Sequence, residues 1–552
     1  MLRIIRWITG ISLFISIFLA IFYLRMIPSI GNPAEFTFDS AFHYRMTDDI
    51  VQKGSVAPID FLSTYPQGKD IAATTPTALY HICASFHKLI NNFYPLPLER
   101  SILLFCALCG SLICIPIYLL SYEIYRNRIT ALMSAFLSGI IPAYLQRTFC
   151  YRYRYEIVAV PLLFMSLLFF IKAFGTANYK KSLFYSLISA LLIILASYFW
   201  RAYALFLLAY IIALLYFLFN LRGLYRDKRI ILFIALGLTA FAWSGLMGKN
   251  ILHYFTLPLD TLEIILYRIG LQQDLSAYAR LLYFNQELTA VSLWGIFSWK
   301  ILSLSGIFAV FYFFSCLNNK NSGPQKKVLF IFLIFFFILT LTFFRNEIIL
   351  GPLVALTLGE SLTFALKQRK MLARGLLLCL IIAILMKTGF DSCKLAVTRS
   401  GYTALKPNLK QAIAMINKLT PKNAVILCDW PDGYPIQTYC RRPTNTDGML
   451  ENPEIIKRIV EIAKIYYSSN EDDLTAFCNK YKITHILISN YKTQVYAVYA
   501  GRDYPKFNNP LYAYLLPKPL LLYKFICEPK KLEKFRLLYR NEEFLIYEVD
   551  TL

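Results

Sequence analysis

The chain has 552 residues, of which 57% are hydrophobic and 16% are charged, and its formal net charge is +24. A soluble globular chain is usually ~45–50% apolar. Here the apolar residues also gather in runs long enough to cross a bilayer, which takes a helix of ~20 residues. This composition excludes an ordinary soluble protein and predicts a polytopic α-helical membrane protein. Its positive charge is expected in cytoplasmic loops and does not indicate nucleic-acid binding.

The N-terminal apolar run, up to about Met26, is too long for a signal peptide and lacks a small-residue cleavage site, so we read it as a retained span. Lys and Arg cluster in alternate loops, and the positive-inside rule assigns those loops to the cytoplasm. The N-terminus is then cytoplasmic, and the membrane is the plasma membrane or the endoplasmic reticulum. About eleven spans are predicted: 5–27, 100–121, 130–146, 156–174, 182–200, 202–220, 230–247, 293–317, 328–344, 348–366 and 375–388.

Two domains are predicted. Residues 1–388 form a transmembrane domain with outer loops 28–99, 147–155 and 248–292. Residues 389–552 form an extracytoplasmic domain, in which strand-length apolar runs alternate with helical patterns, as is typical of a mixed α/β fold. Whether Cys428 and Cys440 form a disulfide there stays open. The expected strands are 424–428, 485–489 and 544–549, and the expected helices are 407–418, 453–468 and 471–481.

The segment from Phe38 to Arg45 follows the first span and carries a carboxylate, an imidazole and a guanidinium close together. Asp39 has two interpretations. It caps the N-terminus of the following helix, as Asp often does, or it is a base or metal ligand that faces a lipid-borne substrate. His43 is more often a hydrogen-bonded structural residue than a ligand.

A second group of polar residues lies in the short outer turn 147–155, where arginines alternate with tyrosines. Arginine forks match phosphate oxygens, although arginines near a membrane also extend to lipid headgroups. Ionisable residues at such positions are functional candidates, and together they favour a pocket for a phosphorylated lipid. The large outer loop contains Glu287. Taken by itself, this residue is best interpreted as a solvated loop acid. The cations and the acid of the predicted pocket are Arg147, Arg152, Arg154, Glu156, Arg201 and Arg345.

Four ordered motifs resemble the catalytic subunit of oligosaccharyltransferases, which belong to the GT-C class of membrane glycosyltransferases. The segment Asp39–Arg45 is similar to the family's D-x-x-(F/Y)-(H/N)-x-R pattern, and 65–68 reads Tyr-Pro-Gln-Gly. Residues 147–156 are similar to R-(S/T)-x-x-G-x-Y-D-x-(D/E). Residues 429–433 stand where the family has W-W-D-x-G. The resemblance covers the whole chain.

The resemblance implies an enzyme that transfers a glycan from a polyprenyl-pyrophosphate donor to an asparagine of an acceptor polypeptide on the extracytoplasmic face. It implies a divalent cation, Mg²⁺ or Mn²⁺, held by the catalytic acids Asp39, Glu156 and Glu287. It also implies that Arg345 contacts the donor phosphate. The segment with Trp430 and Asp432 would bind the acceptor.

Two departures from the family pattern keep alternatives open. Arg154 replaces an expected acid beside the metal site, and Asp429 and Pro431 alter the acceptor motif. The alternatives are a GT-C glycosyltransferase with another acceptor or a metal-independent mechanism, and a non-catalytic paralogue that binds lipid-linked glycan. A carrier-coupled transporter is disfavoured, because no pair of broken helices recurs in matching halves of the chain.

Overall fold

The computed structural model describes residues 2–176, 178–200, 202–220, 293–318, 323–342, 344–448, 453–490 and 520–550, with a few single residues between them. Contacts within the chain divide it into two compact units. The first, here the membrane unit, comprises Met1–Pro33, Pro76–Pro258 and Ala290–Tyr402. The second, here the sheet unit, comprises Ala34–Thr75, Leu259–Thr289 and Thr403–Leu552.

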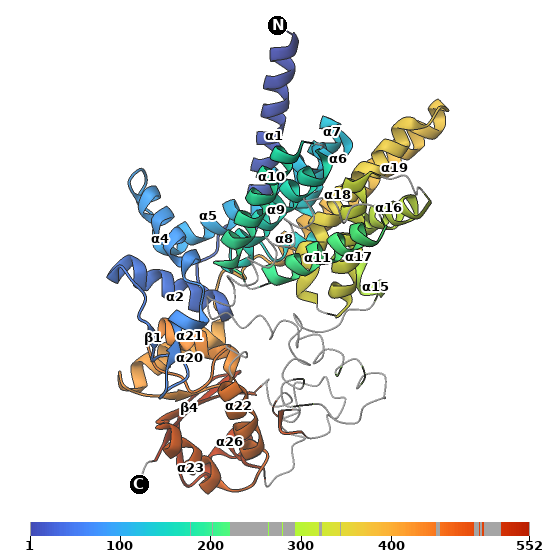
Figure 1. Cartoon of the computed structure of the whole chain (residues 1–552). Coiled ribbons are helices and arrows are strands. Elements are labelled where there is room, and N and C mark those ends of the chain that lie inside the picture. Colours follow the sequence, from blue (N-terminus) through green and yellow to red (C-terminus); the bar gives the residue numbers. More distant parts are fainter. Residues whose placement is uncertain are drawn as a thin grey trace. The chain divides into compact units, whose positions relative to one another are not determined.

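The regular secondary structure in the described part of the membrane unit is helical (Figure 1). Three short 3₁₀ turns, η1 (Ile27–Ser29), η3 (Ser303–Ser305) and η4 (Phe344–Asn346), join or extend its helices. The helices are α1 (Leu2–Met26), α4 (Ala78–Asn91), α5 (Leu98–Ser111), α6 (Cys114–Tyr125), α7 (Arg128–Ile140), α8 (Pro142–Leu145), α9 (Glu156–Gly175), α10 (Tyr179–Ser197), α11 (Tyr203–Asn220), α15 (Leu293–Ile296), α16 (Gly306–Asn318), α17 (Pro324–Thr342), α18 (Glu347–Lys367) and α19 (Met371–Thr398).

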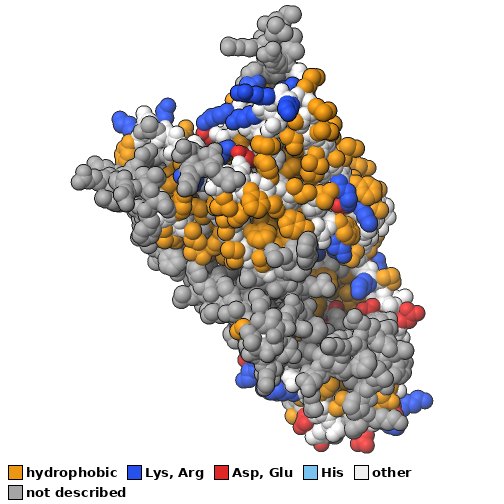
Figure 2. Space-filling model, turned by 90° about the vertical axis from the view of Figure 1, so that its right-hand side faces the viewer, with side chains coloured by type: hydrophobic (Ala, Val, Ile, Leu, Met, Phe, Trp, Pro, Cys, Tyr) orange, Lys and Arg blue, Asp and Glu red, His pale blue; other side chains and the backbone are white. Residues whose placement is uncertain are grey.

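Seven helical segments of the described chain are long and apolar enough to cross a membrane, and three shorter apolar helices accompany them. The predicted count of eleven spans stays a prediction, because the span predicted at 230–247 lies outside the described residues. Figure 2 shows hydrophobic side chains gathered over the part of the molecule where Figure 1 draws these long helices. In an integral membrane protein, such a surface faces lipid.

The long helices are joined by close packing and by polar contacts. Ser166 of α9 donates to the backbone oxygen of Ser189 in α10 at 2.9 Å and lies 3.0 Å from the hydroxyl of Tyr210 in α11. Hydrogen bonds of this kind contribute ~0.6 kcal/mol each between membrane helices. Gly359 of α18 allows close approach to α6, because a β-carbon there would lie 2.2 Å from the ring of Tyr125.

The sheet unit contains a mixed four-stranded sheet in the order β3-β4-β6-β5. The pair β3–β4 is parallel, and β6 pairs antiparallel with both β4 and β5. Helices accompany the sheet (Figure 1), and its fully buried central strand β4 lies in the core. The elements are β3 (Ile426–Leu427), β4 (His485–Ser489), β5 (Phe535–Arg540), β6 (Phe544–Val549), α20 (Pro407–Leu419), α21 (Trp430–Tyr439), α22 (Pro453–Tyr466), α23 (Glu471–Tyr481), α26 (Leu521–Cys527) and the 3₁₀ turn η6 (Pro529–Lys531).

The first outer loop is built into the sheet unit. Its helix α2 (Phe38–Lys53) packs against α21. Gly54 ends α2 in the left-handed conformation, with φ 82°, which glycine adopts without strain. The backbone N–H of Tyr65 donates to the oxygen of Thr444, and the N–H of Thr444 donates to the oxygen of Leu62. The loop also contains β1 (Ile59–Asp60), β2 (Lys69–Asp70) and α3 (Ile71–Thr74).

The predicted strands and helices of the C-terminal region agree with the structure at each of the six positions. The exact boundary at residue 388 stays a prediction. The sequence did not predict β5, α21 or α26. Cys428 and Cys440 are both buried free thiols, so the structure has no disulfide between them.

Candidate functional site

The arginine-rich turn between α8 and α9 is held by an acid from another helix. The Nε atom of Arg147 donates to Oε1 of Glu347 at 3.0 Å, and the amide of Gln146 donates to Oε2 of the same carboxylate at 2.6 Å. Glu347 is the first residue of α18 and is fully buried. Both of its oxygens therefore accept hydrogen bonds, and Arg147 is fixed in a buried ion pair.

Glu156, at the other end of the turn, is the first residue of α9. Its Oε1 accepts two hydrogen bonds from Arg345 of η4, at 3.1 Å from Nε and 2.6 Å from Nη2. Its Oε2 is buried and has no hydrogen-bond partner among the described residues. The charge of Arg154, whose side chain is buried, also acts on this carboxylate. Two guanidinium groups thus neutralise Glu156.

A buried arginine of the first span supports the same turn. Nε of Arg25 donates to the hydroxyl of Thr148 at 3.0 Å, and Nη1 donates to the backbone oxygen of Gly139 at 3.0 Å. The N–H of Cys150 donates in turn to the backbone oxygen of Arg25. A β-carbon on Gly110 would lie 2.8 Å from Nε of Arg25. The helices α1, α5 and α7 therefore together hold the arginine turn in place.

The predicted cations of the turn lie together in the membrane unit, with one exception. Arg147, Arg154 and Arg345 surround the two acids, and the guanidinium of Arg152 lies 5.6 Å from the ring centre of Tyr151. Arg201 lies outside the described residues. Sequence reasoning missed Arg25 and Glu347. Glu347 lies two residues after Arg345, and an acid so close to an outer arginine is the sequence signal that could have identified it.

Asp39 lies in the first turn of α2 and does not cap the helix, since the N-cap residue is Thr37. Phe38 adopts a positive φ of 50°, a conformation that is uncommon for a residue with a large side chain and is enriched at functional sites. Oδ1 of Asp39 lies 3.3 Å from the position of a β-carbon built on Gly448. The carboxylate is only partly buried, and it lies beside the loop that follows β3 and α21.

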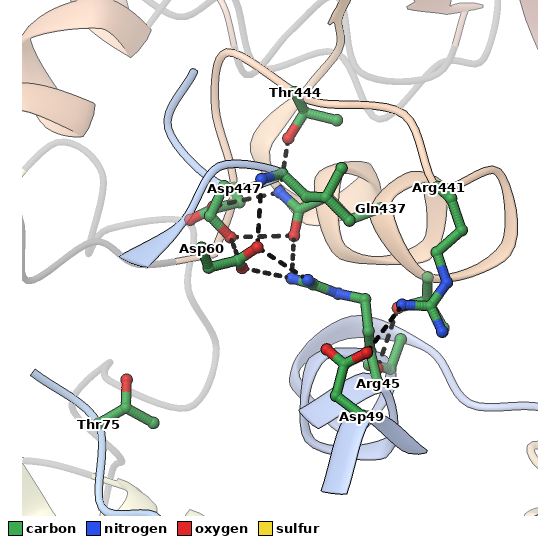
Figure 3. A network of polar contacts seen from close by, with 12 residues as sticks. Arg45, Asp49, Asp60, Thr75, Gln437, Arg441, Thr444 and Asp447 are labelled. Atoms are coloured by element: carbon green, nitrogen blue, oxygen red, sulfur yellow. Dashed lines mark hydrogen bonds and ion pairs between the residues drawn. The ribbon is translucent and has the colours of Figure 1, made fainter. Parts of the chain in front are cut away.

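Figure 3 shows how the same helix is tied to that loop. Arg45 donates to both oxygens of Asp60, at 2.9 and 2.6 Å, and to the amide oxygen of Gln437 at 3.1 Å. The amide nitrogen of Gln437 donates to Thr444 at 2.7 Å and to Asp447 at 3.3 Å. This buried network connects α2, the first loop and α21. It positions the helix that carries Asp39.

The Asp60–Arg45 pair predicts acid sensitivity of the sheet unit. Burial of Asp60 opposes its ionisation, but the charge and hydrogen bonds of Arg45, with those of Ser63 and Leu62, lower the pKa of this carboxyl. The pair therefore stabilises the fold fully above the unfolded-state pKa of about 3.9, and the stabilisation is lost as the pH falls through the lower folded-state pKa. Hydrogen exchange of the α2 amides should show unchanged protection down to about pH 4 and a fall below it.

In an Asp60→Asn variant, the α2 amides should be less protected from hydrogen exchange at neutral pH. Their protection should also change less as the pH falls below 4. An identical acid dependence in the variant would show that other carboxyl groups cause the effect.

The predicted acceptor-binding residues lie at the start of α21. Asp429 caps this helix by accepting from the N–H of Trp430, whose indole N–H donates to the hydroxyl of Tyr499 at 3.2 Å. Asp432 is buried in the first turn. A β-carbon on Gly433 would lie 2.4 Å from the backbone oxygen of Thr446, so this segment packs directly on the loop beside Asp39.

The predicted metal ligands do not form a cluster that the structure describes. Asp39 lies in the sheet unit and Glu156 in the membrane unit, while Glu287 lies outside the described residues. Within the described ranges, no group of three or more His, Cys, Asp or Glu side chains is arranged to hold a metal. Mg²⁺ prefers several oxygen ligands. At the arginine turn the two described carboxylates, Glu156 and Glu347, are already paired with arginines, so the described residues of the turn do not fit the ion.

The fold is that of an integral membrane protein with a separate mixed α/β unit. The chain belongs to the oligosaccharyltransferase STT3 family, because the family model "Oligosaccharyl transferase STT3, N-terminal" matches residues 31–399. This confirms the predicted family. No curated protein sequence matches the chain.

Solved structures share the fold. The oligosaccharyltransferase AglB from Archaeoglobus fulgidus, in complex with an inhibitory peptide and a dolichol-phosphate, matches with a TM-score of 0.70 and 13% identity, over 95% of this chain and 79% of that chain. The same protein tethered with an acceptor peptide that contains the NVT sequon matches with a TM-score of 0.67 and 14% identity. Its complex with Zn and sulfate matches with a TM-score of 0.68 and 14% identity. These two cover the same shares of both chains. ArnT from Cupriavidus metallidurans, bound to undecaprenyl phosphate, gives 0.51 at 11% identity over 97% of both chains.

Proposed function

We propose that the chain transfers a glycan from a polyprenyl-pyrophosphate donor to an asparagine of an acceptor polypeptide, on the extracytoplasmic face of its membrane. The observation that carries this proposal is the buried arginine turn of the membrane unit, where Arg147, Arg154 and Arg345 are arranged around Glu156 and Glu347. Family membership supports the reaction class. The lipid phosphates and peptides in the AglB and ArnT complexes support the two substrate classes.

The residues of each unit have separate roles in this proposal. In the membrane unit, Arg345 and its neighbouring arginines bind the phosphates of the donor, since guanidinium forks match phosphate oxygens. Arg201 and Glu287 are proposed to contribute from the outer side. In the sheet unit, Asp39 accepts a proton from the acceptor amide, and the start of α21, with Trp430 and Asp432, binds the acceptor chain. No step depends on Mg²⁺ or Mn²⁺.

A transfer assay tests the proposal. The full chain, reconstituted in lipid nanodiscs, is incubated with lipid-linked oligosaccharides extracted from the organism that makes it and with a fluorescent peptide that contains an Asn-x-Thr sequon. We expect a glycosylated peptide of lower electrophoretic mobility. The matched control is the same peptide with glutamine in place of the asparagine, which should stay unmodified.

Binding of the lipid-linked oligosaccharide with no transfer to any asparagine peptide would contradict the proposal and favour the non-catalytic paralogue. Modification of the glutamine control would instead point to a different acceptor group.

A further inference from the structure

We propose that the guanidinium groups of Arg154 and Arg345 take the place of a divalent cation, so that this chain binds the diphosphate of a polyprenyl-pyrophosphate lipid without a metal. The ligand class rests on the proposed function, whereas independence from metal rests on the geometry of the arginine turn.

Among the described residues, the turn contains more guanidinium groups than carboxylates. Arg147, Arg154 and Arg345 lie around Glu156 and Glu347, and Arg152 of the same turn lies against the ring of Tyr151. Nearby arginines add to the excess, since the charges of Arg100 and Arg399 act on residues 150 and 151 of the same turn. The described residues therefore give the turn a positive character, which favours binding of a diphosphate.

The acids of the turn are arranged to hold arginines. Both oxygens of Glu347 accept hydrogen bonds, one from Arg147 and one from Gln146. Oε1 of Glu156 accepts two hydrogen bonds from Arg345. A cation placed at Glu156 would meet two positive groups and one carboxylate, so repulsion opposes its binding. Phosphate oxygens placed there would meet guanidinium N–H donors.

Burial distinguishes this cluster from arginines that extend to lipid headgroups. A headgroup-binding arginine keeps its charged end at the water interface. Arg147 is 5% exposed and Arg154 is 7% exposed, whereas the side chain of Arg345 is 35% exposed. Arg147 and Arg154 are thus held in a buried interior, whereas the guanidinium of Arg345 is accessible. That arrangement suits a bound anion that enters from the side of Arg345.

Metal-free binding can be measured with a defined probe. The full chain in detergent is titrated with geranylgeranyl pyrophosphate, with EDTA present and then with Mg²⁺ or Mn²⁺ in excess. We expect the dissociation constant to agree within about twofold under the two conditions. Arg154→Asp should weaken binding in EDTA by about tenfold to a hundredfold, because it removes a charged hydrogen-bond donor and adds a repelling charge. Added Mn²⁺ should restore part of that loss.

The matched control is Arg126→Asp, the same charge reversal at an exposed arginine paired with Glu123, and it should bind the probe as the unchanged chain does. Arg154→Lys should keep metal-independent binding with weaker affinity. Competition by phosphatidylglycerol as strong as by the pyrophosphate would overturn the proposal in favour of a headgroup site.

Two further outcomes separate this inference from the proposed function. Probe binding that requires Mg²⁺ in the unchanged chain overturns the inference and leaves glycan transfer untouched. Tight binding in EDTA without any transfer to peptide supports the inference and contradicts the proposed function.

Discussion

Replacement of Asp39 by asparagine is expected to lower glycan transfer at least about 100-fold, the smaller end of the effect of removing a general base. Asp39 lies in the first turn of α2, follows a residue with positive φ and is partly exposed beside the loop at Gly448. An amide of nearly the same shape cannot accept a proton. Initial rates of peptide glycosylation at saturating donor measure the effect.

The competing interpretation of Asp39 is structural, and the same variant tests it. Thr37, and not Asp39, is the N-cap of α2, so loss of the charge should cost only the helix-dipole contribution of ~0.3–1 kcal/mol. Hydrogen exchange should therefore show α2 almost as well protected as before. Asp48→Asn is the matched control on the same helix, where the acid pairs with Arg441, and it should keep transfer. Full transfer by Asp39→Asn, or a parallel loss of α2 protection, would contradict a catalytic role.

The Asp60→Ala variant is expected to destabilise the sheet unit by about 3–5 kcal/mol, because it leaves the buried guanidinium of Arg45 without its carboxylate. The pair is almost inaccessible, with side chains 2% and 7% exposed. Arg45 keeps one hydrogen bond to Gln437, which limits the loss. The free energy of opening of α2 and α21, from hydrogen exchange of the full chain, measures the effect.

Two comparisons make this prediction specific. Lys410→Met breaks the more exposed Lys410–Glu35 pair of the same unit and should cost only about 0–1 kcal/mol. The double variant Arg45→Met, Asp60→Leu removes both charges and should recover part of the stability lost by Asp60→Ala. Equal losses in the single and double variants would show that packing, and not the unpaired charge, dominates.

Local patterns in the sequence predicted most of the elements. Long apolar runs predicted the membrane helices, and short apolar runs with turn residues between them predicted β3, β4 and β6. Three elements of the C-terminal region were not predicted, namely β5, α21 and α26. β5 contains the exposed residues Arg536 and Arg540 and is mostly half-buried, so it lacks the continuous apolar run that predicted the other strands. α21 contains Pro431, Gly433 and Pro435, residues that usually end a helix.

The candidate site was harder to predict, because its partners are distant in sequence. Asp39, Arg45 and the arginine turn are visible as charged residues at unusual places. No local sequence pattern shows that Glu347 pairs with Arg147, which is 200 residues away. Likewise, no local pattern shows that Asp60 and Gln437 bind Arg45. A motif identifies a charge, but burial decides whether that charge needs a partner. The roles of Asp39, Glu156 and Glu287 as metal ligands stay a prediction.

The contact between Arg45 and Gln437 also has a consequence for biosynthesis. The two residues are 392 positions apart, and chains grow at ~5–20 residues per second. The helix with Asp39 therefore leaves the ribosome roughly 20 to 80 s before its partners do. During that interval Arg45 and Asp60 have each other but no α21 to bury them. Assembly of this part of the protein is thus a late event of synthesis, and a chain that stops before Gln437 retains Asp39 without the scaffold that positions it.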